Sequence, residues 1–457
     1  MGRSLQPVEA FIDSGAAPGW DRLSFADGPL SYGASTNSGR LTHVEALKDV
    51  GGQVLARNRG DVRFVLGSGQ QAMSFLVERG EGYLFASPVT FYTEGRSWDL
   101  SPGYRRGNPH FERPVRPGCL YCHANQAELV EGTENRYRPP FFRGHAIGCE
   151  RCHGPGADHV RAPDSARGIV NPADLEPPLR EGVCQQCHLQ AEARILRAGR
   201  WWTDYRPGRP LHEFIDVYLK TDQDGQNRFI GQVEQMYASR CFRESRGTLG
   251  CISCHDPHRE PRPEERVRHF RDRCLGCHAR DDGGPTSGSQ GSDAGPCSLS
   301  RAERTRQNAA DSCIDCHMPR SASRRILHTA TTDHTVPRDP IRPHPPGPDD
   351  RPGDGPPTNE AHLASFFREL RQKDRDAGRE PETERGRDLG LALSIEAPDV
   401  LPQGGAPTAG TSDRLALGLL EASLARRPED VDAWEARGRV LGRLGEHAEA
   451  WPPSGRP

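Results

Sequence analysis

The sequence predicts a mainly α-helical and irregular chain, with a small β-rich region before it and α-helical hairpins after it. Three observations lead to this prediction. Only 34% of the 457 residues are hydrophobic, whereas 50 glycines and 40 prolines make up about a fifth of the chain, which indicates many loops. Strand-like runs fall within the first hundred residues. A short string of cysteine and histidine then recurs six times.

Composition excludes two classes of partner. The formal net charge of -3 lacks the overall basic character of a nucleic-acid-binding protein. No run approaches the roughly 18 apolar residues that a membrane-spanning helix needs. We therefore predict neither a nucleic-acid partner nor a membrane span in this chain.

The β-rich region is predicted over residues 1–105. Strand-like runs occur at Asp61–Leu66, Ala72–Val77 and Tyr83–Ala86, and the turn Gly80–Gly82 separates the last two. A glycine-containing turn of this length between two such runs is typical of a β-hairpin. No chemistry-bearing cluster is visible in this region.

The recurring string is Cys-x-x-Cys-His, and it contains twelve of the fourteen cysteines. Residues three and four apart share one face of a helical turn, so two thiols can reach both vinyl groups of a haem while the histidine turns to the iron. This is the attachment signature of haem c, with the histidine as proximal ligand. The cysteines are Cys119, Cys122, Cys149, Cys152, Cys184, Cys187, Cys251, Cys254, Cys274, Cys277, Cys313 and Cys316, and the histidines are His123, His153, His188, His255, His278 and His317.

Zinc and thiol redox chemistry are the alternatives. Paired Cys-x-x-Cys units build zinc ribbons, but a ribbon needs no histidine at the fifth position. A thioredoxin-like site would need one motif in a βαβ context. The sequence therefore favours six haem c groups over residues 106–336. Because so few residues are available for each haem, the cofactors themselves must supply much of the apolar core.

Distal ligands and propionate partners are expected near the motifs. Twelve histidines lie outside the motifs, which would suffice for bis-histidine ligation, although any one could equally be a surface residue. The candidate distal ligands are His145, His159, His212, His258, His328 and His334. Arginines can pair with carboxylates through two parallel hydrogen bonds, and the candidates beside the motifs are Arg143, Arg151, Arg180, Arg271 and Arg273.

Two cysteines stand outside the motifs. Cys241 and Cys297 are predicted to form a disulfide, because thiols outside the cytoplasm tend to be oxidised. The alternative is a pair of buried free cysteines.

The C-terminal part is predicted to be helical. A Pro-rich linker at 337–358 precedes helices at Asn359–Leu370 and Leu415–Arg426. Trp434, Gly438 and Leu441 fit the roughly 34-residue tetratricopeptide (TPR) pattern, although an ordinary helical hairpin would fit the spacing equally well. The region 359–457 is therefore expected to contain a partial TPR array.

The stretch from Ser24 to Arg342 resembles the multihaem c-type cytochromes of the cytochrome c-554 type, and more closely the versions fused to TPR repeats. The resemblance rests on Cys149–Gly156, Cys251–His258, Cys313–Arg320 and Thr332–His334. It implies that His159, His258 and His334 are distal ligands to neighbouring haems. It also implies that the TPR helices dock partner proteins.

Members of this family usually begin with a signal peptide and a further Cys-x-x-Cys-His motif. This sequence has neither, and it stops within a repeat. We therefore expect both ends to be truncated. Because haem is attached to such motifs outside the cytoplasm, the expected location is periplasmic or otherwise extracytoplasmic.

Three functions remain open. The first is an electron carrier with six mostly bis-histidine haems that serves redox partner proteins. The second is an oxidoreductase with one open haem that acts on nitrite, hydroxylamine or a similar nitrogen compound, although no motif differs from the other five. The third is a TPR scaffold that docks a redox partner complex.

Overall fold

A computed structural model of the chain describes residues 2–13, 19, 23–37, 40–105, 107–163, 168–189, 191–220, 231–278, 297–322, 330–338, 363–395 and 410–450. The chain forms two compact units. Unit 1 comprises residues 1–171 and 320–332, and unit 2 comprises residues 172–319 and 333–457. Two of the six motifs lie in unit 1 and four lie in unit 2. The domain boundaries given above stay predictions.

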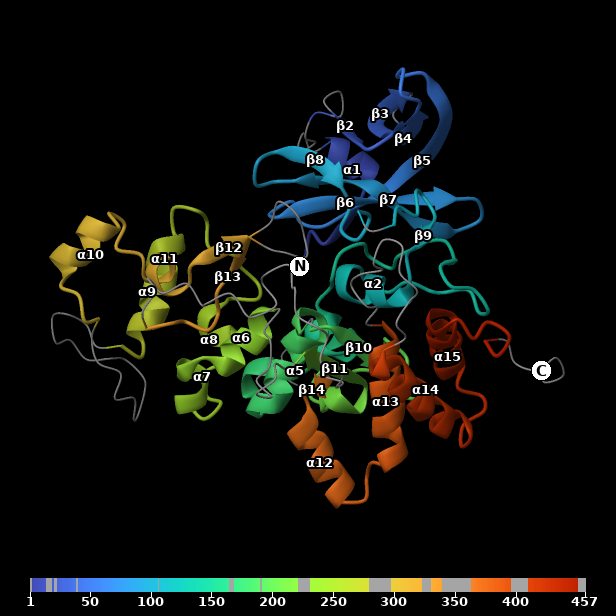
Figure 1. The fold of residues 1–457 in the computed structure, drawn as a ribbon. Helices are drawn as coiled ribbons and strands as arrows, with labels where there is room; N and C mark the ends of the chain where they lie inside the picture. Colours follow the sequence, from blue (N-terminus) through green and yellow to red (C-terminus); the bar gives the residue numbers. More distant parts are fainter. Residues whose placement is uncertain are drawn as a thin grey trace. The chain divides into compact units, whose positions relative to one another are not determined.

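Unit 1 is built on a nine-stranded antiparallel sheet in which β2 to β8 follow one another as neighbours, while β1 pairs with β5 and β9 with β7 (Figure 1). The expected hairpin is confirmed, since Arg79 pairs with Tyr83 across the turn. The elements are β1 (Leu5–Pro7), α1 (Val8–Asp13), β2 (Ser24–Asp27), β3 (Leu30–Asn37), β4 (Arg40–Lys48), β5 (Val54–Leu66), β6 (Ala72–Arg79), β7 (Tyr83–Tyr92), β8 (Ser97–Leu100) and β9 (Arg113–Pro114).

This sheet corrects the predicted fold class. The chain is not mainly α-helical and irregular, because strands run almost without a break from Ser24 to Leu100. Sequence analysis identified only the three apolar runs. It missed β3 and β4 because half or more of their positions are polar or exposed, so the apolar alternation is weak there. Pairing with neighbouring strands, which no local pattern reports, makes them part of the sheet.

The first two motifs follow the strands of this sheet in the sequence and belong to unit 1. Leu120 of helix α2 (Pro117–His123) and Ala124 directly after it pack into a core with Phe64, Leu76 and Leu84 of the sheet, which fixes the first motif on the sheet. The second motif forms α3 (Glu150–His153), followed by α4 (Ala157–Arg161). Two short strands, β12 (Arg320–Ala322) and β13 (Ala330–Thr332), complete this unit.

Unit 2 holds the other four motifs on short helices. A three-stranded sheet, β10–β11–β14, lies beside them. The elements are η2 (Pro172–Asp174), α5 (Pro177–His188), β10 (Ala193–Leu196), η3 (Leu211–Glu213), β11 (Ile215–Lys220), α6 (Gln232–Ala238), α7 (Arg240–Glu244), α8 (Cys251–Cys254), α9 (Arg266–Leu275), α10 (Arg301–Gln307), α11 (Cys313–His317), β14 (Leu363–Ser365), α12 (Arg368–Asp376), α13 (Glu382–Ile395), α14 (Thr411–Leu424) and α15 (Val431–Leu444).

Three of the four motif helices of unit 2 have little core of their own, whereas α5 buries part of its length. None of the residues of α8, α9 or α11 is buried. Helices this short are unstable without packing partners. The arrangement therefore fits the expectation that cofactor, rather than side chains, supplies the apolar core in this part of the chain.

The C-terminal helices do have a core. Ala416 and Leu420 of α14 and Val440 of α15 are fully buried against α13. The predicted helix at Leu415–Arg426 is confirmed as α14, whereas the one predicted at Asn359–Leu370 is wrong in part, because Leu363–Ser365 forms a strand paired with β11. The TPR assignment stays a prediction.

A membrane span was not expected, and none of the helices in the described ranges combines the length and the apolar character that spanning a bilayer requires.

Candidate haem-binding site

The motifs adopt the local geometry that their spacing predicts. In three of them the histidine N–H donates to the carbonyl of the first cysteine, at 3.0 Å for His153, 2.9 Å for His255 and 2.9 Å for His278. This i to i+4 hydrogen bond makes one helical turn. Both thiols and the imidazole therefore lie on one side of the same turn, as two thioether bonds and one axial ligand require.

Two proximal histidines are oriented for iron by backbone carbonyls. His153 Nδ1 lies 2.7 Å from Val170 O, and His317 Nδ1 lies 3.0 Å from Pro337 O. A carbonyl can only accept, so Nδ1 carries the proton and Nε2 keeps its lone pair. Metal-binding histidines are generally held in this way by a partner on the second nitrogen.

The remaining proximal histidines also stay accessible, and none of the six is buried. Desolvation lowers the pKa of His188 and of His255, although both side chains still expose surface. Neutral imidazole is the form that binds a metal.

The third and fourth motifs are held together. The thiols of Cys251 and Cys184 interact, so the first cysteines of the two motifs lie next to each other. The buried Glu181 of α5 accepts the Cys251 N–H at 3.1 Å and so caps α8. A carboxylate is favourable at a helix N-terminus, and here it ties the two motif helices together.

The fifth and sixth motifs are joined in the same way. Cys274 hydrogen-bonds through its thiol to Cys313. Arg271 of α9 donates to Asp311 O at 2.8 Å and pairs with the Asp311 carboxylate at 2.5 Å, directly before α11. Cys254 also lies within electrostatic range of Cys277, which links the fourth motif to the fifth.

One candidate distal ligand faces a proximal histidine. The rings of His255 and His334 lie 6.3 Å apart between centroids, with an angle of 25° between their planes. Two imidazoles bound to one metal should have their ring centres about 6 Å apart. This distance is the sum of two metal–nitrogen bonds of about 2 Å and about 1 Å from each nitrogen to its ring centre. An Asp333 turn and a 2.8 Å hydrogen bond from the His334 N–H to Gln235 hold the loop in place. The centroid separation therefore matches that of two imidazoles that share one iron, while the ring planes lie stacked.

The other distal candidates are placed less decisively. His145 is exposed and His159 is half-buried, whereas His258 is 76% exposed and lies 3.8 Å from Asp256. His212 Nε2 lies 2.8 Å from Asp374 Oδ2, so this nitrogen is occupied by a hydrogen bond to a carboxylate. His328 lies outside the described residues.

His269 on α9 is a further candidate that the sequence does not mark. Its Nε2 is buried and has no hydrogen-bond partner among the described residues. The ring packs edge-to-face on Phe270, which also contacts His255. An unpaired buried nitrogen is costly, and no motif or spacing marks this histidine in the sequence.

The two cysteines outside the motifs are free thiols here, so their predicted disulfide stays a prediction. Cys241 lies within electrostatic range of Cys277, and Cys297 within range of Cys316. Of the arginines expected to meet propionates, Arg180 pairs with Glu181 at 2.9 Å, and Arg271 is held by Asp311.

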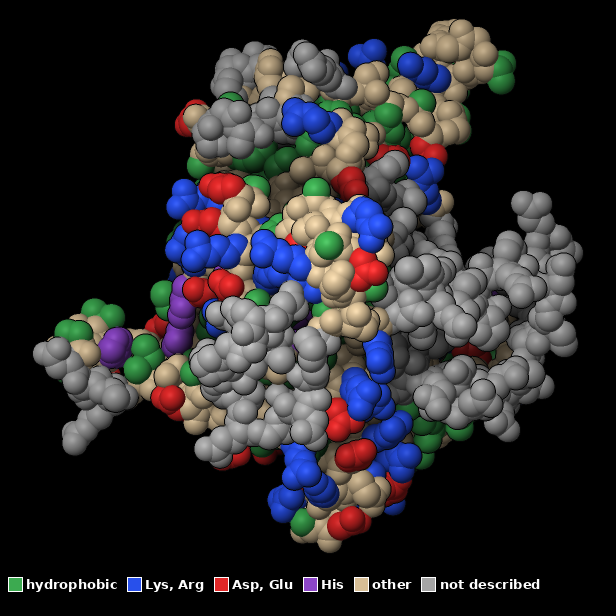
Figure 2. Space-filling model, turned by 90° about the vertical axis from the view of Figure 1, so that its left-hand side faces the viewer, with side chains coloured by type: hydrophobic (Ala, Val, Ile, Leu, Met, Phe, Trp, Pro, Cys, Tyr) green, Lys and Arg blue, Asp and Glu red, His purple; other side chains and the backbone are tan. Residues whose placement is uncertain are grey.

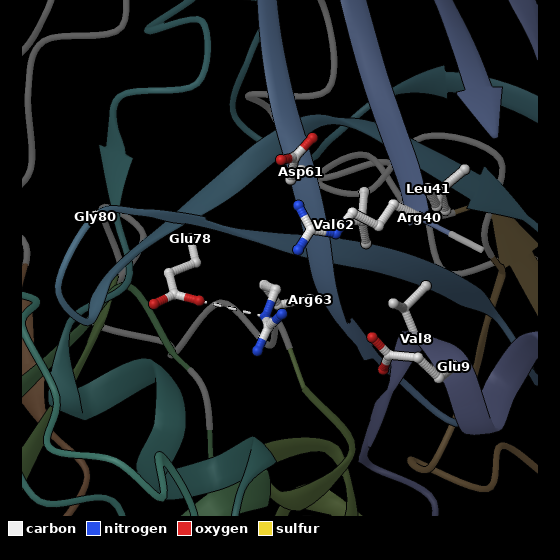
Figure 3. A pocket seen from close by; sticks show the side chains of 9 residues that line it. All are labelled: Val8, Glu9, Arg40, Leu41, Asp61, Val62, Arg63, Glu78 and Gly80. Carbon is white, nitrogen blue, oxygen red and sulfur yellow. Dashed lines mark ion pairs between the residues drawn. The ribbon is translucent and has the colours of Figure 1, made fainter. Parts of the chain in front are cut away.

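Two features concern other kinds of site. Across the described ranges, no three His, Cys, Asp or Glu side chains are grouped to hold a metal ion. Figure 3 shows a pocket of about 240 Å³ in unit 1, crossed by the 3.3 Å ion pair Arg63–Glu78. Its volume is below the roughly 300–1,000 Å³ of small-molecule sites, and its lining includes no cysteine or histidine.

Comparison with known proteins agrees with this site. The model of the family "Cytochrome c554 and c-prime" matches residues 104–154, and that of the "Doubled CXXCH motif" matches residues 245–283. No curated protein and no solved structure matches the chain. Together with the helical motifs, the two family matches support a multihaem cytochrome of the c type, with covalently bound haem.

Proposed function

We propose that the protein is an electron carrier that holds six haem c groups, one on each Cys-x-x-Cys-His turn. Covalently bound haem supplies reversible one-electron chemistry. The observation that supports a carrier is the contact between successive motifs, Cys184 with Cys251 and Cys274 with Cys313. Cofactors attached at touching thiols would lie next to one another, and electron transfer is fastest between adjacent groups.

The proposed ligation is mostly bis-histidine. His255 and His334 form the best-supported pair, and His159, His258, His145 and His328 remain candidates for the other irons. His212 is left out because Asp374 holds its Nε2. His269 joins the candidates because its buried Nε2 needs a partner.

The proposed setting is extracytoplasmic, with redox proteins as partners, and docking through TPR helices at α13–α15. On the face shown in Figure 2, basic and acidic side chains alternate, and the described residues there form no extended field of one sign. Such a surface suits brief encounters with proteins better than binding to a polyanion.

Carbon monoxide tests the carrier assignment. The full chain, produced with an export signal and haem-maturation proteins, is expected to show c-type absorption bands that do not respond to carbon monoxide after reduction, because two histidines close each iron. A pyridine haemochrome assay should count six haems per chain. A carbon monoxide response from about one haem in six would contradict the carrier and favour catalysis, with nitrite and hydroxylamine as the first substrates to try.

Replacing His334 with alanine should open one iron. The variant is expected to keep six haems and to bind carbon monoxide at one of them, because His255 would lose the imidazole that faces it at 6.3 Å. His447→Ala, which removes an exposed histidine, is the matched control and should behave like the wild type. If the reduced His334→Ala protein ignores carbon monoxide, the proposed pair is wrong.

A further inference from the structure

A buried carboxylate lies in unit 1, away from every motif in the sequence. Glu45 of β4 is only 3% exposed. It accepts a hydrogen bond from His110 Nδ1, one from Asn108 Nδ2 at 3.1 Å, and one from the hydroxyl of Tyr32. Burying a charge costs several kcal/mol, and such pairs are weak evidence for a role in stability alone.

His110 is held in a single orientation. Its backbone is left-handed, with φ of 53°, and its N–H donates to Asn108 Oδ1 at 2.8 Å. The next residue, Phe111, is completely buried in the sheet core. A non-glycine residue in this conformation is uncommon and persists where the surroundings impose it. The imidazole is nevertheless 47% exposed, so the ring is fixed at one nitrogen and open at the other.

The same arrangement recurs at two proximal histidines. His153 and His317 also have Nδ1 engaged by an oxygen acceptor. His110 has the stronger acceptor, because a carboxylate makes the imidazole a more basic ligand than a carbonyl does. His212 shows the opposite arrangement, with Nε2 itself bound to a carboxylate.

A single available imidazole meets what one axial position of a haem iron requires. Zinc and copper sites need three or four protein ligands, and the described residues contain no such group. One axial position of a haem iron needs a single imidazole, since the macrocycle and the proximal histidine supply the rest. His110 also lies nine residues before Cys119 and in the same compact unit as the first two motifs.

We propose that His110 Nε2 is an axial ligand to a haem iron, and that Glu45 is the positioning residue that orients it and raises its basicity. This assignment rests on the proposed function, because it requires haem on the chain. It adds to the predicted distal ligands a histidine that no motif marks.

The decisive variant is His110→Met in the haem-loaded full chain. Methionine ligation raises the reduction potential of a c-type haem and gives ferric haem a characteristic charge-transfer band. We expect one haem in six to move to a higher potential in a redox titration, and this band to appear. Glu45→Gln should keep six haems and shift the same haem in the same direction by less, because the ligand becomes less basic. His447→Met is the control.

Two outcomes would overturn the assignment. If His110→Met and Glu45→Gln both carry six haems and titrate like the wild type, His110 binds no iron, while the carrier proposal stands. If the wild-type chain matures without covalent haem, both proposals fall. If His110→Met fails to fold, the assignment is tested by the shift in reduction potential of Glu45→Gln alone. This variant should fold, because glutamine has nearly the same shape as glutamate.

Discussion

A chain in which both Cys251 and Cys254 are alanine is expected to carry five haems instead of six, so its haemochrome absorbance should fall by about one sixth. No residue of α8 is buried, and both Glu181 and the Cys184 thiol interact with the helix. Without its cofactor this segment should lose its support. Limited proteolysis is therefore expected to cut within 231–278 in the variant and to spare the wild type.

Cys241→Ala is the matched control, because it also removes a thiol from this part of unit 2 but none from a motif. It should keep six haems and the wild-type cleavage pattern. Six haems in the Cys251→Ala/Cys254→Ala double variant would show that the fourth motif is not an attachment site. Five haems with wild-type protease resistance would show that the side chains alone stabilise this segment.

Arg371→Met is expected to lower the free energy of unfolding by about 3–5 kcal/mol, because it leaves buried carboxylates without their cation. Arg371 is 2% exposed and pairs with Asp216, with Glu380 at 2.9 Å and with Asp388 at 3.1 Å. These contacts join α12 and α13 to β11. Urea denaturation followed by circular dichroism measures the change.

The loss of stability in Arg371→Met should depend on pH. Burial by itself would raise the pKa of Glu380, but hydrogen bonding and attraction from Arg371 and Arg197 outweigh it and hold that pKa below its usual value. A carboxylate with a lowered folded-state pKa contributes stability above its unfolded pKa of about 4.3 and loses it as the pH falls. The difference in the free energy of unfolding between the wild type and Arg371→Met should therefore be larger at pH 8 than at pH 4.

The control is Arg385→Met, because Arg385 forms an exposed 3.6 Å pair with Glu382 on α13. Surface pairs of this kind contribute about 0.5 kcal/mol or less. Equal losses for Arg371→Met and Arg385→Met, or a gap that does not change with pH, would contradict a structural role for the buried network.

Sequence analysis worked where the information is local. A Cys-x-x-Cys-His string fits a single helical turn, and the structure places every motif on or at the end of a short helix. The hairpin at Gly80–Gly82 and helix α14 were likewise predictable from adjacent residues. The fold class was wrong because strands such as β4 have a weak apolar pattern of their own, and their pairing partners lie elsewhere in the chain.

By itself, then, the sequence determined which residues can attach haem, since covalent attachment depends on spacing within five residues. Tertiary structure alone decided which groups meet. It brings Cys184 to Cys251 and His255 to His334, and it places Glu45 behind His110, across separations of 65 to 79 residues. Such contacts depend on strand pairing and helix packing over long loops, which no short pattern records. For the same reason, a histidine without a motif became a candidate ligand only after the fold was known.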